Sequence, residues 1–177
     1  MADPTPSPSD PAAEHRAAWQ AWEQALVDAV LGLHDGHEVS ILAPPGHVRL
    51  TRARSGRMRW LAGARRRPVA PSVRLVRVED HLRGHWSGAE RFGGPFPWTR
   101  EEEEAVLACG WHRPTVGDGE DFVRFWPDDV PRGRFLPLDD ARRAAAAVAH
   151  TFRVVLAVTP DGGEPEGGLP AVRHDAG

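Results

Sequence analysis

The spacing of the apolar residues changes once near the start of the chain, and this change limits the folds that the chain can adopt. Up to Gly36 the apolar residues recur at intervals of three and four, which predicts an amphipathic helix that begins after the N-cap Asp10 and ends near Gly36. Its apolar stripe is Trp19, Trp22, Leu26, Val30 and Leu33. Segments 37–43, 47–53 and 57–63 then alternate apolar and polar residues, which predicts three half-buried strands. Because their connections are too short for crossover helices, we expect these strands to pair antiparallel.

Further along the chain, two apolar runs and one long amphipathic segment predict additional elements. Residues 72–78 and 121–126 predict strands, and a basic loop, 64–71, precedes the first of them. Residues 138–158 begin with acidic side chains and predict a helix. The apolar stripe of that helix is Ala141, Ala145, Val148, Phe152 and Val155.

Segment 100–109 carries the signals of both ends of a helix. Thr99 and Glu102 have the spacing of a capping box, and Gly110 lies where a glycine commonly ends a helix. The predicted order is therefore a helix, three or four strands, a helix, a strand and a helix. An antiparallel sheet with helices packed on one face would bury these elements, so we predict an α+β fold.

The chain of 177 residues is long enough for one full core, and two independent cores are not expected. Residues 1–10 and 160–177 are rich in Pro, Gly and acidic side chains, so we expect disordered tails around a single domain over residues 11–159. The sequence shows neither a secretory signal nor an apolar run of membrane-spanning length, and Cys109 has no second cysteine to pair with. These features predict a cytoplasmic protein with no membrane association.

The basic residues are unusual in type and in position. All 22 are arginine, and Lys, Asn and Tyr are absent, which is typical of a GC-rich bacterial genome. The excess of arginine is therefore not by itself a sign of phosphate or carboxylate recognition. Residues 49–91 hold 12 arginines against Glu79, Asp80 and Glu90, although the formal net charge of the whole chain is −3. A strongly basic stretch thus lies within an otherwise acidic chain.

Two motifs have the spacing of metal ligands but lack the rest of a metal site. Cys109 and His112 have no further cysteine pair to complete the four ligands of a structural zinc site. His81 and His85 lie four residues apart, but Leu82 stands where a metalloprotease motif has its catalytic Glu. The sequence also contains no nucleophile elbow and no phosphate-binding glycine loop. We therefore predict no metal, no cofactor and no enzyme activity, and keep a metal-dependent enzyme built on His81 and His85 as the weakest alternative.

Strand alternation predicts a basic face on segments 47–53 and 57–63. The apolar residues predicted to face the helices are Val48, Leu50, Met58 and Trp60. The opposite face then carries Arg49, Thr51, Arg57 and Arg59. Such a face predicts the binding of a protein or peptide client through an acidic segment. One alternative is a nucleic-acid-associated protein that uses the surface of residues 49–77. A sequence pI of about 6.3 disfavours this alternative. Another alternative is that the arginines have no binding role and only keep the outer face of the sheet in contact with solvent.

Four stretches together resemble a known family: 22–33 (WEQALVDAVLGL), 97–114 (PWTREEEEAVLACGWHRP), 121–126 (DFVRFW) and 151–158 (TFRVVLAV). Over residues 14–158 the chain resembles the actinobacterial TY-Chap group, whose domains are grouped with type III secretion chaperones and YbjN-type proteins. The resemblance implies a type III secretion chaperone-like α+β fold that binds peptides and has no catalytic residues. It leaves a homodimer open.

The most specific part of this resemblance is the transition from a helix to an aromatic strand. Gly110 and Trp111 are followed by a proline and then by a strand that begins at Phe122, which is similar to the family's pattern. The basic stretch 65–95 is longer than the family's connection. Two residues depart from the family's usual ones: Cys109 stands for Leu and Asp121 for Asn. The motif predicts a structural hinge in which Gly110 ends the helix and the two aromatic side chains pack on the sheet.

Overall fold

The computed structural model describes residues 10–52, 66–115, 119–127, 135–160 and 168–175. In these residues the α-helices are α1 (Pro11–Leu31), α2 (Arg100–Ala108) and α3 (Leu138–Val155). The strands are β1 (Glu38–Leu42), β2 (Arg49–Arg52), β3 (Arg66–Val69), β4 (Ser72–Val78), β5 (His81–Trp86), β6 (Phe122–Trp126) and β7 (Ala171–Asp175). Two short 3-10 helices, η1 (Pro45–His47) and η2 (Glu90–Phe92), lie in connections. The strand predicted over 57–63 lies outside the described residues.

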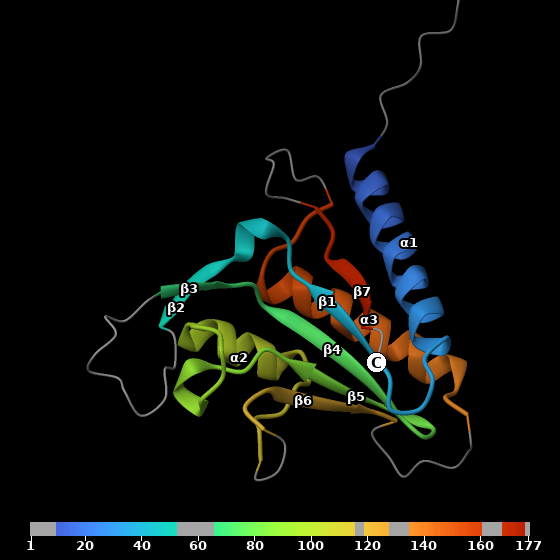
Figure 1. The fold of residues 1–177 in the computed structure, drawn as a ribbon. Coiled ribbons are helices and arrows are strands. Elements are labelled where there is room, and N and C mark those ends of the chain that lie inside the picture. The colour runs from blue at the N-terminus through green and yellow to red at the C-terminus, as the bar shows by residue number, and fades with distance from the viewer. Residues whose placement is uncertain (1–9, 53–65, 116–118, 128–134, 161–167, 176–177) are drawn as a thin grey trace, which may run out of the picture.

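Five strands form one antiparallel sheet in the order β6-β5-β4-β1-β7 (Figure 1). Strand β2 does not join it and pairs instead with β3 in a separate two-stranded arm. The prediction that segments 37–43 and 47–53 pair with each other is therefore wrong. Pro44 and Pro45 have no backbone N–H to donate to a ladder, and here they lead the chain into η1 instead of a hairpin turn.

Three strands lie where the sequence predicted none. Strand β3 falls within the predicted basic loop 64–71, and β5 follows β4 directly as its antiparallel neighbour. Strand β7 falls within the predicted C-terminal tail, so the expectation of disorder is wrong for residues 171–175. Its partner β1 lies at the other end of the chain, and the local composition of a tail contains no sign of such a distant partner.

The three predicted helices are confirmed, and two of them begin with the predicted caps. Asp10 accepts a hydrogen bond from the backbone N–H of Ala12 at 3.0 Å. Thr99 and Glu102 form the reciprocal capping box of α2. No helix in the described part of the chain is long and apolar enough to span a bilayer.

Helix α1 ends at Leu31, before the predicted end near Gly36. The guanidinium of Arg77, on β4, donates to the carbonyl oxygen of Leu33 at 2.5 Å, and the N–H of Gly36 donates to the carbonyl oxygen of Arg77 at 2.9 Å. Gly36 has a φ of +76°, which an L side chain rarely adopts. The contacts with β4 therefore turn the chain away from the helix axis and into β1.

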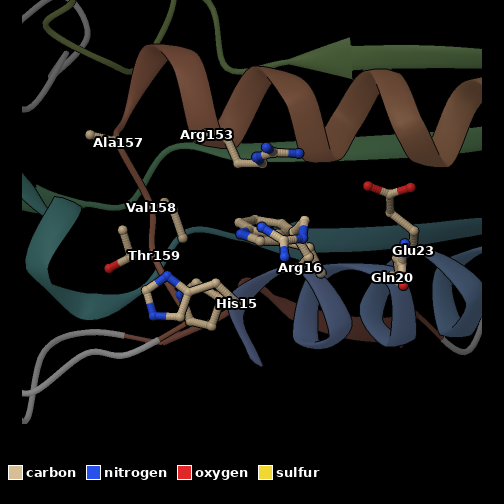
Figure 2. A pocket seen from close by; sticks show the side chains of 10 residues that line it. His15, Arg16, Gln20, Glu23, Arg153, Ala157, Val158 and Thr159 are labelled. Atoms are coloured by element: carbon tan, nitrogen blue, oxygen red, sulfur yellow. The ribbon is translucent and has the colours of Figure 1, made fainter. Parts of the chain in front are cut away.

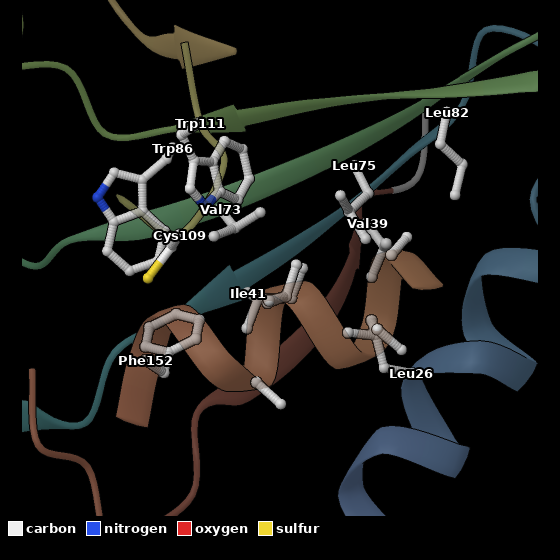
Figure 3. Packing of buried hydrophobic residues seen from close by; sticks show 14 of the residues in the cluster. Leu26, Val39, Ile41, Val73, Leu75, Leu82, Trp86, Cys109, Trp111 and Phe152 are labelled. Carbon is white, nitrogen blue, oxygen red and sulfur yellow. The ribbon is translucent and has the colours of Figure 1, made fainter. Parts of the chain in front are cut away.

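The core lies between the sheet and the helices, which pack on one of its faces (Figure 3). Cross-strand pairing brings the inward side chains of neighbouring strands opposite each other: Val39 faces Leu75, Val73 faces Ile41 and Trp86. The helices cover this face with the predicted apolar stripes. Their fully buried members include Leu26, Val30, Ala141, Ala145, Val148 and Phe152. In Figure 1, α3 crosses behind the strands with α1 beside it.

Residues 109–112 form the predicted hinge between α2 and β6. Gly110 has a φ of +86°, and the Arg124 guanidinium donates to the carbonyl oxygen of Cys109 at 2.5 Å. Trp111 is buried, and its indole Nε1 donates to the Thr151 hydroxyl at 2.9 Å. The next residue, His112, exchanges two backbone hydrogen bonds with Val123 of β6. The hinge thus ends the helix, buries one indole and returns the chain beside the sheet.

Candidate functional site

The arm formed by β2 and β3 carries two of the residues predicted to bind a client, Arg49 and Thr51. The side chains of β2 point the opposite way from the prediction. Val48 and Leu50 are 41% and 59% exposed, whereas Thr51 is 7% exposed. The prediction that Val48 and Leu50 face the helices is therefore wrong.

Two carboxylates explain this reversal. The Arg49 guanidinium forms a bidentate ion pair with the Glu102 carboxylate, with 2.7 Å between Nη1 and Oε2. It also donates to the carbonyl oxygen of Pro97 at 3.2 Å. The hydroxyl of Thr51 donates to the carboxylate of Glu90. These contacts draw the polar side chains of β2 inward and connect the arm to η2 and to the N-terminus of α2.

The remaining predicted residues, Arg57 and Arg59, lie outside the described residues, together with Met58 and Trp60. A client-binding role for Arg49, Thr51, Arg57 and Arg59 stays a prediction.

The ion pair between Arg49 and Glu102 makes the stability of the arm dependent on pH. The hydrogen bond from Arg49 lowers the pKa of Glu102 below its ordinary value of 4.5, and the hydrogen bond to Glu102 raises the pKa of Arg49. Burial, and then the charge of Arg49, lower the pKa of His47. Because the folded-state pKa of Glu102 is depressed, its contribution to stability is present above pH 4.5 and is lost as the pH falls through the depressed value.

We expect Glu102→Gln to lower the melting temperature at pH 7, and the difference from the wild type to shrink as the pH falls through the depressed pKa of Glu102. Glutamine still serves a capping box, so the substitution mainly removes the ion pair. Glu104→Gln is the matched control, because Glu104 lies on the same helix and makes an exposed pair with Arg100. Thermal unfolding followed by circular dichroism over a series of decreasing pH values measures the effect. A deficit for Glu102→Gln that stays constant over the whole acidic series would contradict the assignment.

The face of the five-stranded sheet opposite the core carries both basic and apolar side chains. We call it the open face and define it by two cross-strand rows: Glu38, Val76, Arg83 and Phe125, then Ser40, Arg74, His85 and Val123. Every member except Val123 is at least partly exposed. Strand parity places these residues opposite the inward-facing core residues.

The sequence-based search did not identify the open face as a client site: it weighed His85 only as a metal ligand, and it included Arg74 and Val76 only within the alternative surface of residues 49–77. The available signal was the alternation in β5, where Leu82, Gly84 and Trp86 are buried between partly exposed polar residues. Because Gly84 has no side chain, the sequence of β5 lacks an apolar residue at that buried position, and the alternation of apolar and polar residues is not apparent. A Cβ at this position would lie 2.8 Å from the ring of Trp126 and 3.1 Å from that of Trp111, so packed indoles require the glycine.

Arg74 and Arg83 each make weak contacts on the open face. The Arg74 guanidinium lies 3.3 Å from both the Glu38 and the Asp121 carboxylates, and its side chain is 43% exposed. The guanidinium carbon of Arg83 lies 5.7 Å from the ring centroid of Phe125. Exposed ion pairs and cation–π contacts of this kind contribute only about 0.2 to 1 kcal/mol each. Contacts with a ligand can therefore replace these particular contacts at a small cost in free energy.

The histidine and cysteine motifs do not converge on one point. His81 and His85 lie four residues apart on an extended strand, which places their Cα atoms about 13 Å apart. Burial raises the pKa of the Cys109 thiol, and the Cys109 side chain belongs to the apolar core. Within the described ranges, no group of three or more His, Cys, Asp or Glu side chains is placed to hold a metal ion.

A cleft of about 620 Å³ lies between α1 and the residues that follow α3 (Figure 2). Arg16, Trp19 and Glu23 line it from α1, and Arg153 lines it from α3. The guanidinium carbon of Arg153 lies 5.8 Å from the ring centroid of Trp19. Because the lining includes both arginines and a glutamate, its charge does not select one class of ligand.

Comparison with known families identifies the chain. Residues 12–161 match the TY-Chap3 family, described as T3SS (YopN, CesT) and YbjN peptide-binding chaperone 3. No curated protein and no solved structure matches the chain. The match spans α1 through α3, which includes the hinge at Gly110 and strands β1 to β6. The chain therefore belongs to the TY-Chap3 family of peptide-binding chaperone domains.

Proposed function

We propose that this protein is a non-enzymatic module that binds an extended, acidic segment of a protein client on its open face. Membership of a peptide-binding chaperone family is the observation that carries the proposal. The open face supports it with a suitable surface, because this face combines two arginines with the exposed ring of Phe125. The proposal places the protein in the cytoplasm. An actinobacterial source and a homodimer stay predictions.

The arrangement of Arg74 and Arg83 suits an extended peptide. Arg74 pairs with His85 and Arg83 with Val76, so the two arginines are diagonal neighbours on β4 and β5. Diagonal neighbours on adjacent antiparallel strands lie roughly 7 to 8 Å apart. Side chains two residues apart in an extended peptide lie on the same face with a similar spacing of about 7 Å. Two carboxylates at alternate positions of a client can therefore reach both guanidinium groups.

The test uses a labelled octapeptide of alternating Glu and Val, with a peptide of alternating Lys and Val as the negative control. If each exposed pair contributes about 0.5 kcal/mol, the double variant Arg74→Gln/Arg83→Gln should bind the acidic peptide about fivefold more weakly. Binding by the wild type should also weaken as salt is raised. Fluorescence anisotropy at two ionic strengths measures both effects.

The matched control is Arg100→Gln/Arg142→Gln, which removes the same charge from exposed positions on α2 and α3. Circular dichroism checks that both double variants remain folded. Equal weakening in the two double variants would assign binding to net charge rather than to the open face. Unchanged binding in Arg74→Gln/Arg83→Gln would remove the open face as the client site.

A further inference from the structure

Strand β7 lies outside the family domain. The family match ends at residue 161, whereas β7 comprises Ala171–Asp175. Within the matched residues that the structure describes, β1 has a neighbour on one edge only, which is β4. The other edge of β1 pairs with β7. The pairing is antiparallel over five positions, from Glu38 opposite Asp175 to Leu42 opposite Ala171. A segment beyond the family domain therefore completes its sheet (Figure 1).

This segment contacts the domain as a bound peptide would. Its backbone forms a ladder with β1, and Leu169 and Val172 pack against the core. Pro170 is buried, and its carbonyl oxygen accepts a hydrogen bond from the indole Nε1 of Trp22 at 2.8 Å. Arg173 points to the exposed side. Main-chain hydrogen bonds combined with pockets for a few alternating side chains are the pattern by which a sheet edge binds an extended peptide.

We propose that the edge of β1, together with Trp22, is a binding slot for an extended peptide, and that residues 169–175 occupy this slot in the same chain. The slot selects an apolar residue at the position of Leu169, an apolar residue three positions later, and an accessible carbonyl group between them for Trp22. A client of this chemistry enters by displacing β7. This inference rests on the proposed peptide-binding function and adds a second, separate contact site to the open face.

The covalent link makes the resident segment a strong competitor. Residues 162–168 connect it to the end of the family domain, and short linkers give effective concentrations in the millimolar range. A free peptide with the same contacts must exceed that concentration to displace the segment. Weakening the resident segment should therefore raise the apparent affinity of the slot for an added peptide, by at least about tenfold if the resident segment fills the slot at least about 90% of the time.

The experiment keeps the full chain and disables only the resident segment. The double variant Leu169→Asp/Val172→Asp removes both apolar contacts, and the probe is a labelled peptide of residues 168–175 with the native sequence. Fluorescence anisotropy should show at least tenfold tighter binding to this variant than to the wild type. Arg173→Asp is the matched control, because it changes the net charge by the same amount at an exposed position. This control should bind the peptide as weakly as the wild type does.

A second measurement on the wild type keeps the proposal testable if the double variant does not fold. Hydrogen exchange should show that the amides of β7 open with a much lower free energy than those of β4 and β5. Exchange of the β7 amides only through global unfolding would overturn the proposal, as would equal peptide binding by wild type and folded double variant. A dimer in which each chain's β7 pairs with the β1 of the other chain would overturn the proposal that residues 169–175 occupy the slot of their own chain. The probe contains only one acidic residue, whereas the test of the open face uses a peptide of alternating Glu and Val. If the probe does not bind, the result of the open-face test is therefore unaffected.

Discussion

Replacing Gly88 with alanine is expected to lower the free energy of unfolding by at least about 3 kcal/mol. A Cβ at this position would lie 1.7 Å from the carbonyl oxygen and 2.5 Å from the carbonyl carbon of Glu120, and both atoms belong to the backbone. A hydrogen bond also joins Gly88 to the segment before β6, because the Gly88 N–H donates to the Asp121 carboxylate at 3.0 Å. Neither side of this contact can yield by a change of rotamer, so the connection before β6 must move.

For a chain of this length, such a loss corresponds to a fall in melting temperature of roughly 6 to 12 °C. Gly36→Ala is the control, because its added Cβ has no atom within 4 Å and only the strain at a φ of +76° opposes it. That strain costs about 1 to 2 kcal/mol. Thermal unfolding of the two variants separates close backbone approach from backbone conformation. A smaller loss for Gly88→Ala than for Gly36→Ala would contradict this explanation.

Trp111→Ala is expected to lower the free energy of unfolding by about 3 to 5 kcal/mol. The indole is 1% exposed, and its ring centroid lies 5.9 Å from that of Trp86 and 6.0 Å from that of Trp126. Its removal leaves a cavity under the sheet and takes away the donor to the Thr151 hydroxyl. Thr151 keeps its own bond to the carbonyl oxygen of Ala147 at 2.7 Å, so the unmade hydrogen bond is the smaller part of the loss.

Trp111→Phe distinguishes packing from hydrogen bonding. Phenylalanine retains an aromatic ring in the core but cannot donate to Thr151, so we expect a loss of about 1 to 3 kcal/mol, smaller than that of alanine. Urea unfolding of the wild type and both variants measures these losses, with an unchanged m-value as the check on two-state behaviour. A loss below about 1 kcal/mol for Trp111→Ala would show that the indole is not part of the cooperative core.

The elements that sequence reasoning predicted best are those whose signals are local. The caps of α1 and α2 and the apolar stripes of the helices depend on residues within a few positions of each other, and the structure confirms them. Strands β1, β4 and β6 also lie within predicted segments. Which strands become neighbours depends on distant contacts instead. Nothing in the local pattern of β1 distinguishes β2, the expected neighbour, from β4 and β7, the observed ones.

The orientation of β2 shows why the candidate site was harder to predict than the fold. The alternation of Val48, Arg49, Leu50 and Thr51 correctly predicted a strand, and it also predicted that the apolar pair would face inward. The structure reverses this choice because Glu90 and Glu102, far along the chain, provide inward partners for Thr51 and Arg49. An ion pair or hydrogen bond with a distant residue can outweigh the burial of two aliphatic side chains, and a local periodicity contains no information about it.

The distance in sequence between β1 and β7 has a consequence for the protein during its synthesis. Strand β1 leaves the ribosome about 130 residues before β7, which at roughly 5 to 20 residues per second is about 7 to 26 seconds. For that time its edge has no partner from the C-terminal segment, whatever the final stability of the sheet. Unpaired strand edges readily pair with other extended chains. A newly made molecule therefore passes through an interval in which a neighbouring nascent chain, or an early client, can reach the edge of β1 without displacing anything.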